Sequence, residues 1–152
     1  NVKAFPGSGR DATQAFSSGT GDVLISYENE AILARQNGEK IDYVVPQDTL
    51  LIENPAAVLK DADPKAQAFL DYVRTAKGQQ QYVSKGFRPL SSVQGVKIGE
   101  VEGANDPKNP FPTPKTLFTI EGDFGGWSAV NEKFFHEKDG IITKLQLQAG
   151  LS

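Results

Sequence analysis

One stretch limits the fold of this chain more than any other, because a short apolar run changes abruptly into a helix start. Residues 21–31 are Gly-Asp-Val-Leu-Ile-Ser-Tyr-Glu-Asn-Glu-Ala. The unbroken apolar run at residues 23–25 is typical of a strand that is buried on both faces of a parallel sheet. The polar residues after it open a helix through residues 31–34. We therefore predict half of a βαβ unit with Tyr27 at the end of its strand, where ligands bind in open α/β sheets.

Length and composition exclude several classes of protein. The chain has 152 residues and is 38% hydrophobic, which is enough for a core and suggests about one domain. Its net charge of -3 argues against a nucleic-acid groove, which needs a basic face. No apolar run approaches the ~20 residues of a membrane span, and the opening Asn-Val-Lys does not resemble a signal peptide. The absence of cysteine excludes disulfides and thiolate metal sites, and the absence of methionine leads us to expect a processed protein or an excised piece.

A glycine-rich loop lies near the start of the chain. We expect a strand at residues 1–5 to enter the loop Pro6-Gly7-Ser8-Gly9, from which Ser8 or Gly9 caps a short helix through residues 12–16. Free backbone N–H groups converge at such a helix start, and the helix dipole favours negative charge there. The loop is therefore a candidate anion site, and a plain turn with a helix cap is the alternative interpretation.

The rest of the chain follows the same α/β pattern. We expect the apolar residues of a helix that begins at Pro64 to belong to the core, and Trp127 to pack where a helix docks. The segment 95–114 is rich in loops. Strands are predicted at residues 41–45, 49–53, 56–60 and 117–120, and helices from residue 64 to 83 with an interruption at Gly78, from 124 to 135, and from 141 to 147.

The residue types suggest two other kinds of site. His136 is the only histidine, and a Ser8–His136–Asp hydrolase triad would need it. Ser8, however, lacks the strand, Gly-x-Ser-x-Gly turn and helix that surround such a nucleophile. A metal site made by Glu28, Glu30 and His136 is less favoured, because residues two apart do not face the same side of a helix.

Several motifs, taken in order along the chain, resemble one protein family over nearly the whole sequence. They resemble the carboxyl-terminal half of the sulfate-binding proteins of ABC importers, which have the type II periplasmic binding-protein fold. The motifs are the stretch 21–31, Ser8-Gly9-Arg10, Ala68-Phe69-Leu70-Asp71-Tyr72 with Gly78-Gln79, Gly86-Phe87-Arg88-Pro89, and Leu117-Phe118 with Phe124-Gly125-Gly126-Trp127.

The resemblance implies an α/β fold with two Rossmann-like lobes, of which the amino-terminal portion is missing here. Residues 1–45 would form part of the ligand-binding second lobe. Residues 46–152 would form a crossover segment and helices that return toward the first lobe. A Ser-Gly-Gly anion loop that such proteins carry upstream would be absent from this chain.

The resemblance also implies a set of anion-binding residues. The loop amide that the family directs at sulfate falls near Gly9, after Ser8, and Arg10 matches the arginine beside it. The family's tryptophan, which donates its indole N–H, falls on Tyr27, so a hydroxyl replaces that donor here. The spacing between these two parts is one residue shorter than in the family. Asp11 places a carboxylate near the site, where it can cap the helix or pair with Arg10 instead.

The function implied by the resemblance is that of a non-enzymatic receptor for a small tetrahedral oxyanion, sulfate or thiosulfate. It would need no cofactor and would deliver its ligand to an ABC transporter permease in the periplasm or outer cell envelope. Its partners would be the permease and either the missing amino-terminal half or a second copy of the chain, with no nucleic acid. Another oxyanion such as molybdate or phosphate, or ferric ion held by Tyr27 and Tyr43, is the alternative, and a hydrolase is less favoured.

Overall fold

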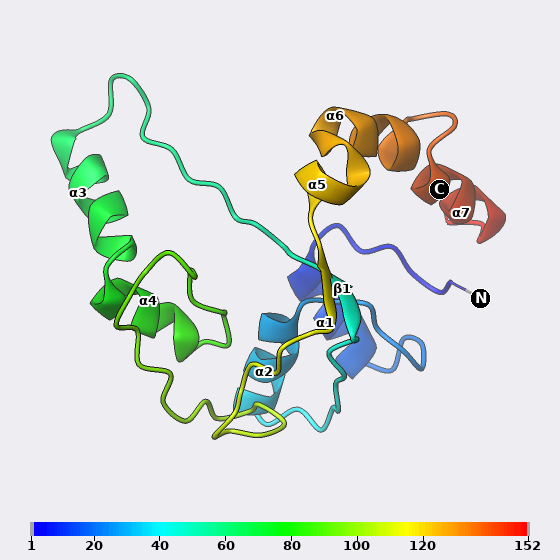
Figure 1. Ribbon diagram of the computed structural model, residues 1–152. Helices are drawn as coiled ribbons and strands as arrows, with labels where there is room; N and C mark the ends of the chain where they lie inside the picture. Colours follow the sequence, from blue (N-terminus) through cyan, green and yellow to red (C-terminus); the bar gives the residue numbers. More distant parts are fainter. Residues whose placement is uncertain (1, 152) are drawn as a thin grey trace. The chain divides into compact units, whose positions relative to one another are not determined.

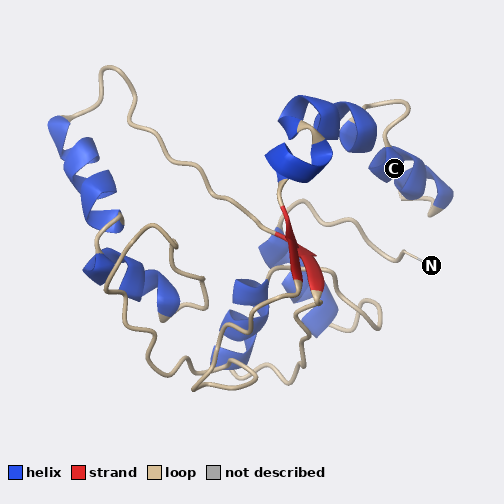
Figure 2. Cartoon of the chain, in the orientation of Figure 1, coloured by secondary structure: helices blue, strands red, loops and turns tan. Residues whose placement is uncertain are grey.

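The computed structural model describes residues 2–151, most of which form helices and connecting loops (Figure 2). These residues divide into two compact units, each of which is described by itself. The first unit contains the chain up to Ser26, Val44–Ile52 and the chain from Thr113 onward, and the second contains Tyr27–Tyr43 and Glu53–Pro112. The elements, labelled in Figure 1, are α1 (Gly9–Ser17), α2 (Glu28–Gln36), β1 (Asp48–Leu50), α3 (Pro64–Val73), α4 (Ala76–Val83), β2 (Thr116–Phe118), α5 (Ile120–Phe124), α6 (Gly126–Val130), the π-helix η1 (Asn131–Phe135) and α7 (Ile141–Gln148).

A short parallel sheet and an aromatic cluster organise the first unit. β1 and β2 lie side by side with Thr49 opposite Leu117 in the register. Beyond β2, the ring of Phe124 makes edge-on contacts with Phe118 and Phe134, at centroid distances of 6.5 and 6.2 Å. These contacts join the sheet to the helical segment that follows it.

The second unit is built around Ile32 of α2, which is completely buried. Val83, Val101 and Ala104 are buried with it. Partly buried side chains surround this cluster; they are Tyr43, Val96 and Phe111.

Gly86 allows the chain to pass directly over Ile32. It has a φ of +84°, and a Cβ atom placed there would lie 2.9 Å from the Ile32 side chain. The same backbone therefore needs glycine both for its left-handed conformation and for its close approach.

The helices predicted at residues 12–16, 31–34 and 141–147 are confirmed by α1, α2 and α7. The prediction that Gly78 interrupts the helix after Pro64 is wrong, since the break falls at residues 74–75 and Gly78 lies inside α4. Thr75 caps α4, and its hydroxyl accepts a hydrogen bond from the Gly78 N–H at 3.0 Å. A Cβ atom at Gly78 would lie 2.2 Å from the Tyr72 carbonyl oxygen, so this glycine allows two successive helices to approach closely.

Several predicted strands are absent from the described residues. The segments 2–5, 23–25, 41–45 and 56–60 have no strand, and residue 1 lies outside the description. The predicted burial of residues 23–25 is also wrong, because Val23 and Ile25 are 85% and 96% exposed. A strand requires a hydrogen-bonded neighbour, and within residues 2–151 only β1 and β2 pair with each other.

The apolar residues expected to be core on α3 are not fully buried: Phe69 is exposed, and Ala66, Leu70 and Val73 are partly buried. Phe69 is 66% exposed, and no α3 residue is buried. Trp127, which was expected to pack at a helix contact, is 57% exposed. Packing of the described residues therefore leaves Phe69 and Trp127 more than half exposed.

We predict that the exposed side chains of Val23 and Ile25, within the apolar run at residues 23–25, promote self-association, because exposed apolar surface drives proteins together. Light scattering should give a mass above the 16.4 kDa of one chain at high concentration. Replacing both Val23 and Ile25 with threonine should shift the mass toward 16.4 kDa. The variant Ser26→Thr, at an exposed polar position beside the run, should leave the mass unchanged. A monomeric unmodified chain at all concentrations would contradict this prediction.

We also predict that Gly86→Ala destabilises the second unit more than Gly38→Ala. Both glycines have positive φ, but nothing lies within 4 Å of a Cβ atom at Gly38. Gly38→Ala should therefore cost only the left-handed strain of about 1–2 kcal/mol. Gly86→Ala should add about 1–3 kcal/mol of overpacking against Ile32. Urea unfolding of the two variants measures this difference, and equal free energies of unfolding would show that Ile32 moves aside at no cost.

Candidate anion-binding site

The first part of the predicted site lies at the start of α1. Ser8 caps this helix, and its hydroxyl oxygen accepts a hydrogen bond from the Asp11 N–H at 3.1 Å. The same hydroxyl donates to the Asp11 carboxylate at 2.8 Å. Asp11 thus takes part in the helix cap, which was one of the two roles expected for it.

Gly9 and Arg10 follow the cap as the first two helical residues. At these positions a backbone N–H has no acceptor within its own helix, and the dipole leaves a partial positive charge. Gly9 is partly buried and its carbonyl accepts a hydrogen bond from the buried Thr13 hydroxyl at 3.1 Å. Arg10 is exposed. The first turn is therefore stabilised by the hydrogen bond from Thr13 to Gly9, while the Arg10 side chain faces solvent.

Tyr27 lies at the start of α2, where the sequence predicted it. It is the N-cap residue, in an extended conformation with φ of -98° and ψ of 148°, and its side chain makes no capping hydrogen bond. Its carbonyl oxygen accepts from the N–H groups of Glu30 and Ala31, at 3.1 and 3.3 Å. The ring is partly exposed. The backbone of Tyr27 thus begins the helix, and its side chain is accessible to a ligand.

The structure brings together only part of the predicted site. Ser8, Gly9 and Arg10 are consecutive at the start of α1 in the first unit, whereas Tyr27 belongs to the second unit. Contact of one anion with both helix starts therefore stays a prediction.

Sequence reasoning missed an ion pair directly beside Tyr27. The Arg88 guanidinium donates to both carboxylate oxygens of Glu28, from Nε at 2.6 Å and from Nη2 at 2.9 Å. In the sequence, Arg88 lies in one family motif and Glu28 in another, the stretch 21–31. The two residues are 60 positions apart, and no pattern in a single sequence pairs charges at that separation.

The residues of the alternative sites are engaged with their own neighbours. The Ser8 hydroxyl bonds to Asp11, while His136 Nδ1 accepts from the backbone N–H of Asp139 at 3.2 Å. The Tyr43 hydroxyl accepts from the Asn105 N–H at 3.1 Å. Across residues 2–151, no group of three or more histidine, aspartate or glutamate side chains is arranged to hold a metal ion.

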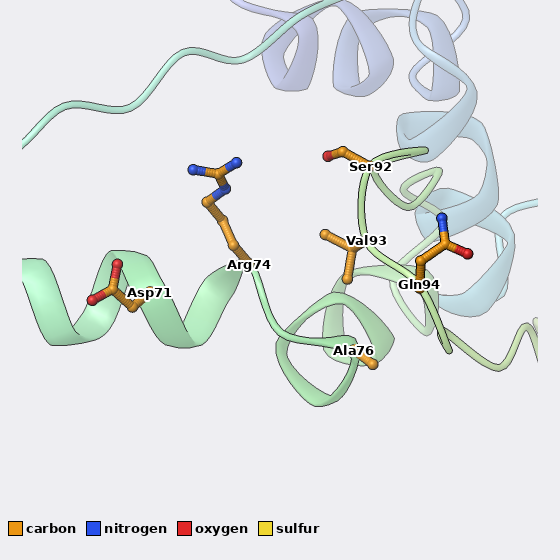
Figure 3. Close-up of a pocket in the computed structure, with 6 residues that line it drawn as sticks. All are labelled: Asp71, Arg74, Ala76, Ser92, Val93 and Gln94. Atoms are coloured by element: carbon orange, nitrogen blue, oxygen red, sulfur yellow. The ribbon is translucent and has the colours of Figure 1, made fainter.

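A surface hollow of about 430 Å³ in the second unit contains none of the predicted site residues. Figure 3 shows Asp71 and Arg74 on one side of it and Ser92 and Val93 on the other. The complete lining is Asp71, Arg74, Ala76, Ser92, Val93 and Gln94. Its two opposite charges give it no preference for an anion.

The predicted site residues lie at two helix starts, one in each unit. Comparison with known proteins agrees with the predicted resemblance. Residues 1–88 match the model of the bacterial extracellular solute-binding protein family. This match covers more than half of the chain, so the chain belongs to that family. None of the helices between residues 2 and 151 is long and apolar enough to cross a lipid bilayer.

Individual relatives carry more specific names. A sulfate-binding protein of Synechococcus elongatus is 37% identical over 96% of this chain, and one of Synechocystis is 35% identical over 97%. A thiosulfate-binding protein of Escherichia coli is 30% identical over 99% of this chain. The chain spans 41%, 42% and 44% of the lengths of these three relatives.

Proposed function

We propose that this chain is part of a periplasmic receptor that binds sulfate or thiosulfate and delivers it to an ABC transporter permease. The observation that carries this proposal is the similarity to sulfate-binding and thiosulfate-binding proteins over nearly the whole chain. Both helix starts of the predicted site lie within residues 1–88, which match the family model. The relatives are binding proteins by name, which supports a role without catalysis.

The anion would be held by hydrogen-bond donors rather than by a bound metal. The Gly9 N–H, Arg10 and the Tyr27 hydroxyl each offer a donor, and the dipoles of α1 and α2 favour negative charge at their starts. The Ser8 hydroxyl donates to Asp11 and so holds the first turn of α1, to which Gly9 and Arg10 belong. Sulfate would accept hydrogen bonds from all three donors.

The complete receptor would have the two Rossmann-like lobes of the type II fold. In this proposal residues 1–45 belong to the ligand-binding lobe, and the chain from residue 46 onward returns toward the other lobe. The portion of the relatives that this chain does not match, or a second copy of the chain, would cover the exposed apolar faces. Closure of the two lobes would bury the anion and create the surface that docks on the permease.

We predict that Tyr27→Phe weakens sulfate binding on the order of ten- to a hundredfold, because it removes one hydrogen bond to a charged ligand, worth about 1.5–3 kcal/mol. Tyr27→Trp should keep much of the affinity, since the indole N–H also donates. The matched control is Tyr72→Phe, another partly exposed tyrosine of the second unit. NMR titration with sodium sulfate measures the dissociation constants. An unchanged constant for Tyr27→Phe would remove Tyr27 from the site.

We further predict that hydrogen phosphate binds at least about tenfold more weakly than sulfate at neutral pH. Its proton would face a donor instead of an acceptor, and an unpaired buried donor costs about 1–3 kcal/mol. Asp11 is the one carboxylate in the turn, and its bond to Ser8 occupies it. Parallel titrations with sulfate, phosphate and molybdate test this selectivity. Suppose that the original chain binds phosphate and sulfate equally well, and that Asp11→Asn binds phosphate more weakly than sulfate. This result would mean that Asp11 accepts the phosphate proton and that the site is not built of donors alone.

A further inference from the structure

A negative charge lies directly beside the proposed anion ligand Tyr27. Glu28 is the first residue of α2, and its side chain is only 17% exposed. A carboxylate at a helix N-terminus stabilises the helix, but it repels a dianion bound near the same turn. Poorly hydrated charges interact more strongly than those in bulk water. A receptor that uses this helix start for sulfate must therefore compensate the charge of Glu28.

Arg88 supplies that compensation in a well-defined geometry. Its guanidinium makes a two-point contact with Glu28, with N–O distances of 2.6 and 2.9 Å. Nη2 also donates to the Pro112 carbonyl at 2.8 Å, and the guanidinium carbon lies 5.5 Å from the centroid of the Phe111 ring. The side chain is 34% exposed. Arg88 is thus held by contacts on several sides rather than extended into solvent.

We propose that Arg88 is a charge-compensating residue of the anion site, which neutralises Glu28 so that the start of α2 can accept a dianion at Tyr27. This inference rests on the proposed function. Arg88 acts on the anion only through Glu28 and is not itself a ligand. Two-point pairing with a carboxylate is the geometry that arginine makes best, and it leaves neither carboxylate oxygen without a cationic partner.

The test is a set of four variants whose predicted effects differ in sign. Arg88→Gln exposes the anion to the charge of Glu28 and should weaken sulfate binding about fivefold, from charge repulsion over several ångströms in a partly hydrated site. Glu28→Gln removes that charge and should bind sulfate at least as tightly as the unmodified chain. The double variant should return to near the original affinity. Arg88→Lys keeps the positive charge and should keep most of the affinity.

Sulfate titrations followed by NMR, with thermal unfolding of each variant, give the readout. The loss of sulfate affinity in Arg88→Gln should become smaller as the sodium chloride concentration is raised, because salt screens exposed charges. Lys77→Gln, at an exposed position of α4, is the control for the loss of one positive charge. It should change the affinity less than Arg88→Gln does.

The outcomes separate this inference from the proposed function. If Glu28→Gln weakens binding as much as Arg88→Gln and the double variant shows no recovery, the pair is only structural and the inference is wrong. If Arg88→Gln fails to fold, the sulfate affinity of Glu28→Gln decides alone: an affinity at least as high as that of the unmodified chain supports the inference, and a lower one contradicts it. If the unmodified chain shows no response to sulfate or thiosulfate, the proposed function is wrong and the inference falls with it.

Discussion

The second unit depends on how closely the backbone approaches one side chain, that of Ile32. Residues distant in the sequence meet this fully buried isoleucine, including Val83, Val101 and Ala104. Gly86 allows one loop to pass over it without a Cβ atom, and Gly103 takes a similar position over its carbonyl oxygen. Because α2 carries Ile32 at its centre, the same packing fixes the helix whose first turn holds Tyr27 and Glu28. A small core thus determines where the candidate site residues of this unit lie.

Sequence reasoning succeeded where the decisive contacts are local. The Ser8 cap depends on Asp11 three residues later, and Pro64 is the first residue of a helix that Asp63 caps. The start of α2 after Tyr27 was likewise predicted correctly. In each case a turn of helix is determined by residues that are neighbours in the chain.

The failures have a common physical cause, which is dependence on distant partners. Residues 23–25 have the composition of a buried strand, but a strand forms only where another segment supplies its hydrogen bonds. Gly78 illustrates a different limit, since a glycine that normally weakens helices here serves the close contact with Tyr72. In the candidate site, the position of Tyr27 at a helix start could be predicted from its place after the apolar run. The pairing of Glu28 with Arg88 could not, because it is set by the tertiary packing of the second unit.

Gln79 has a consequence for how the second unit opens. Its side-chain amide donates to the Val73 carbonyl at the end of α3, and its amide oxygen accepts from the Leu90 N–H in the loop after Pro89. A single buried side chain therefore protects a loop N–H from exchange with solvent. Leu90 can exchange its amide hydrogen only when α4 shifts or the loop detaches, so these segments should open as one cooperative unit. Arg88 lies two residues away on the same loop, and the charge balance at the start of α2 thus depends on the local stability of α4.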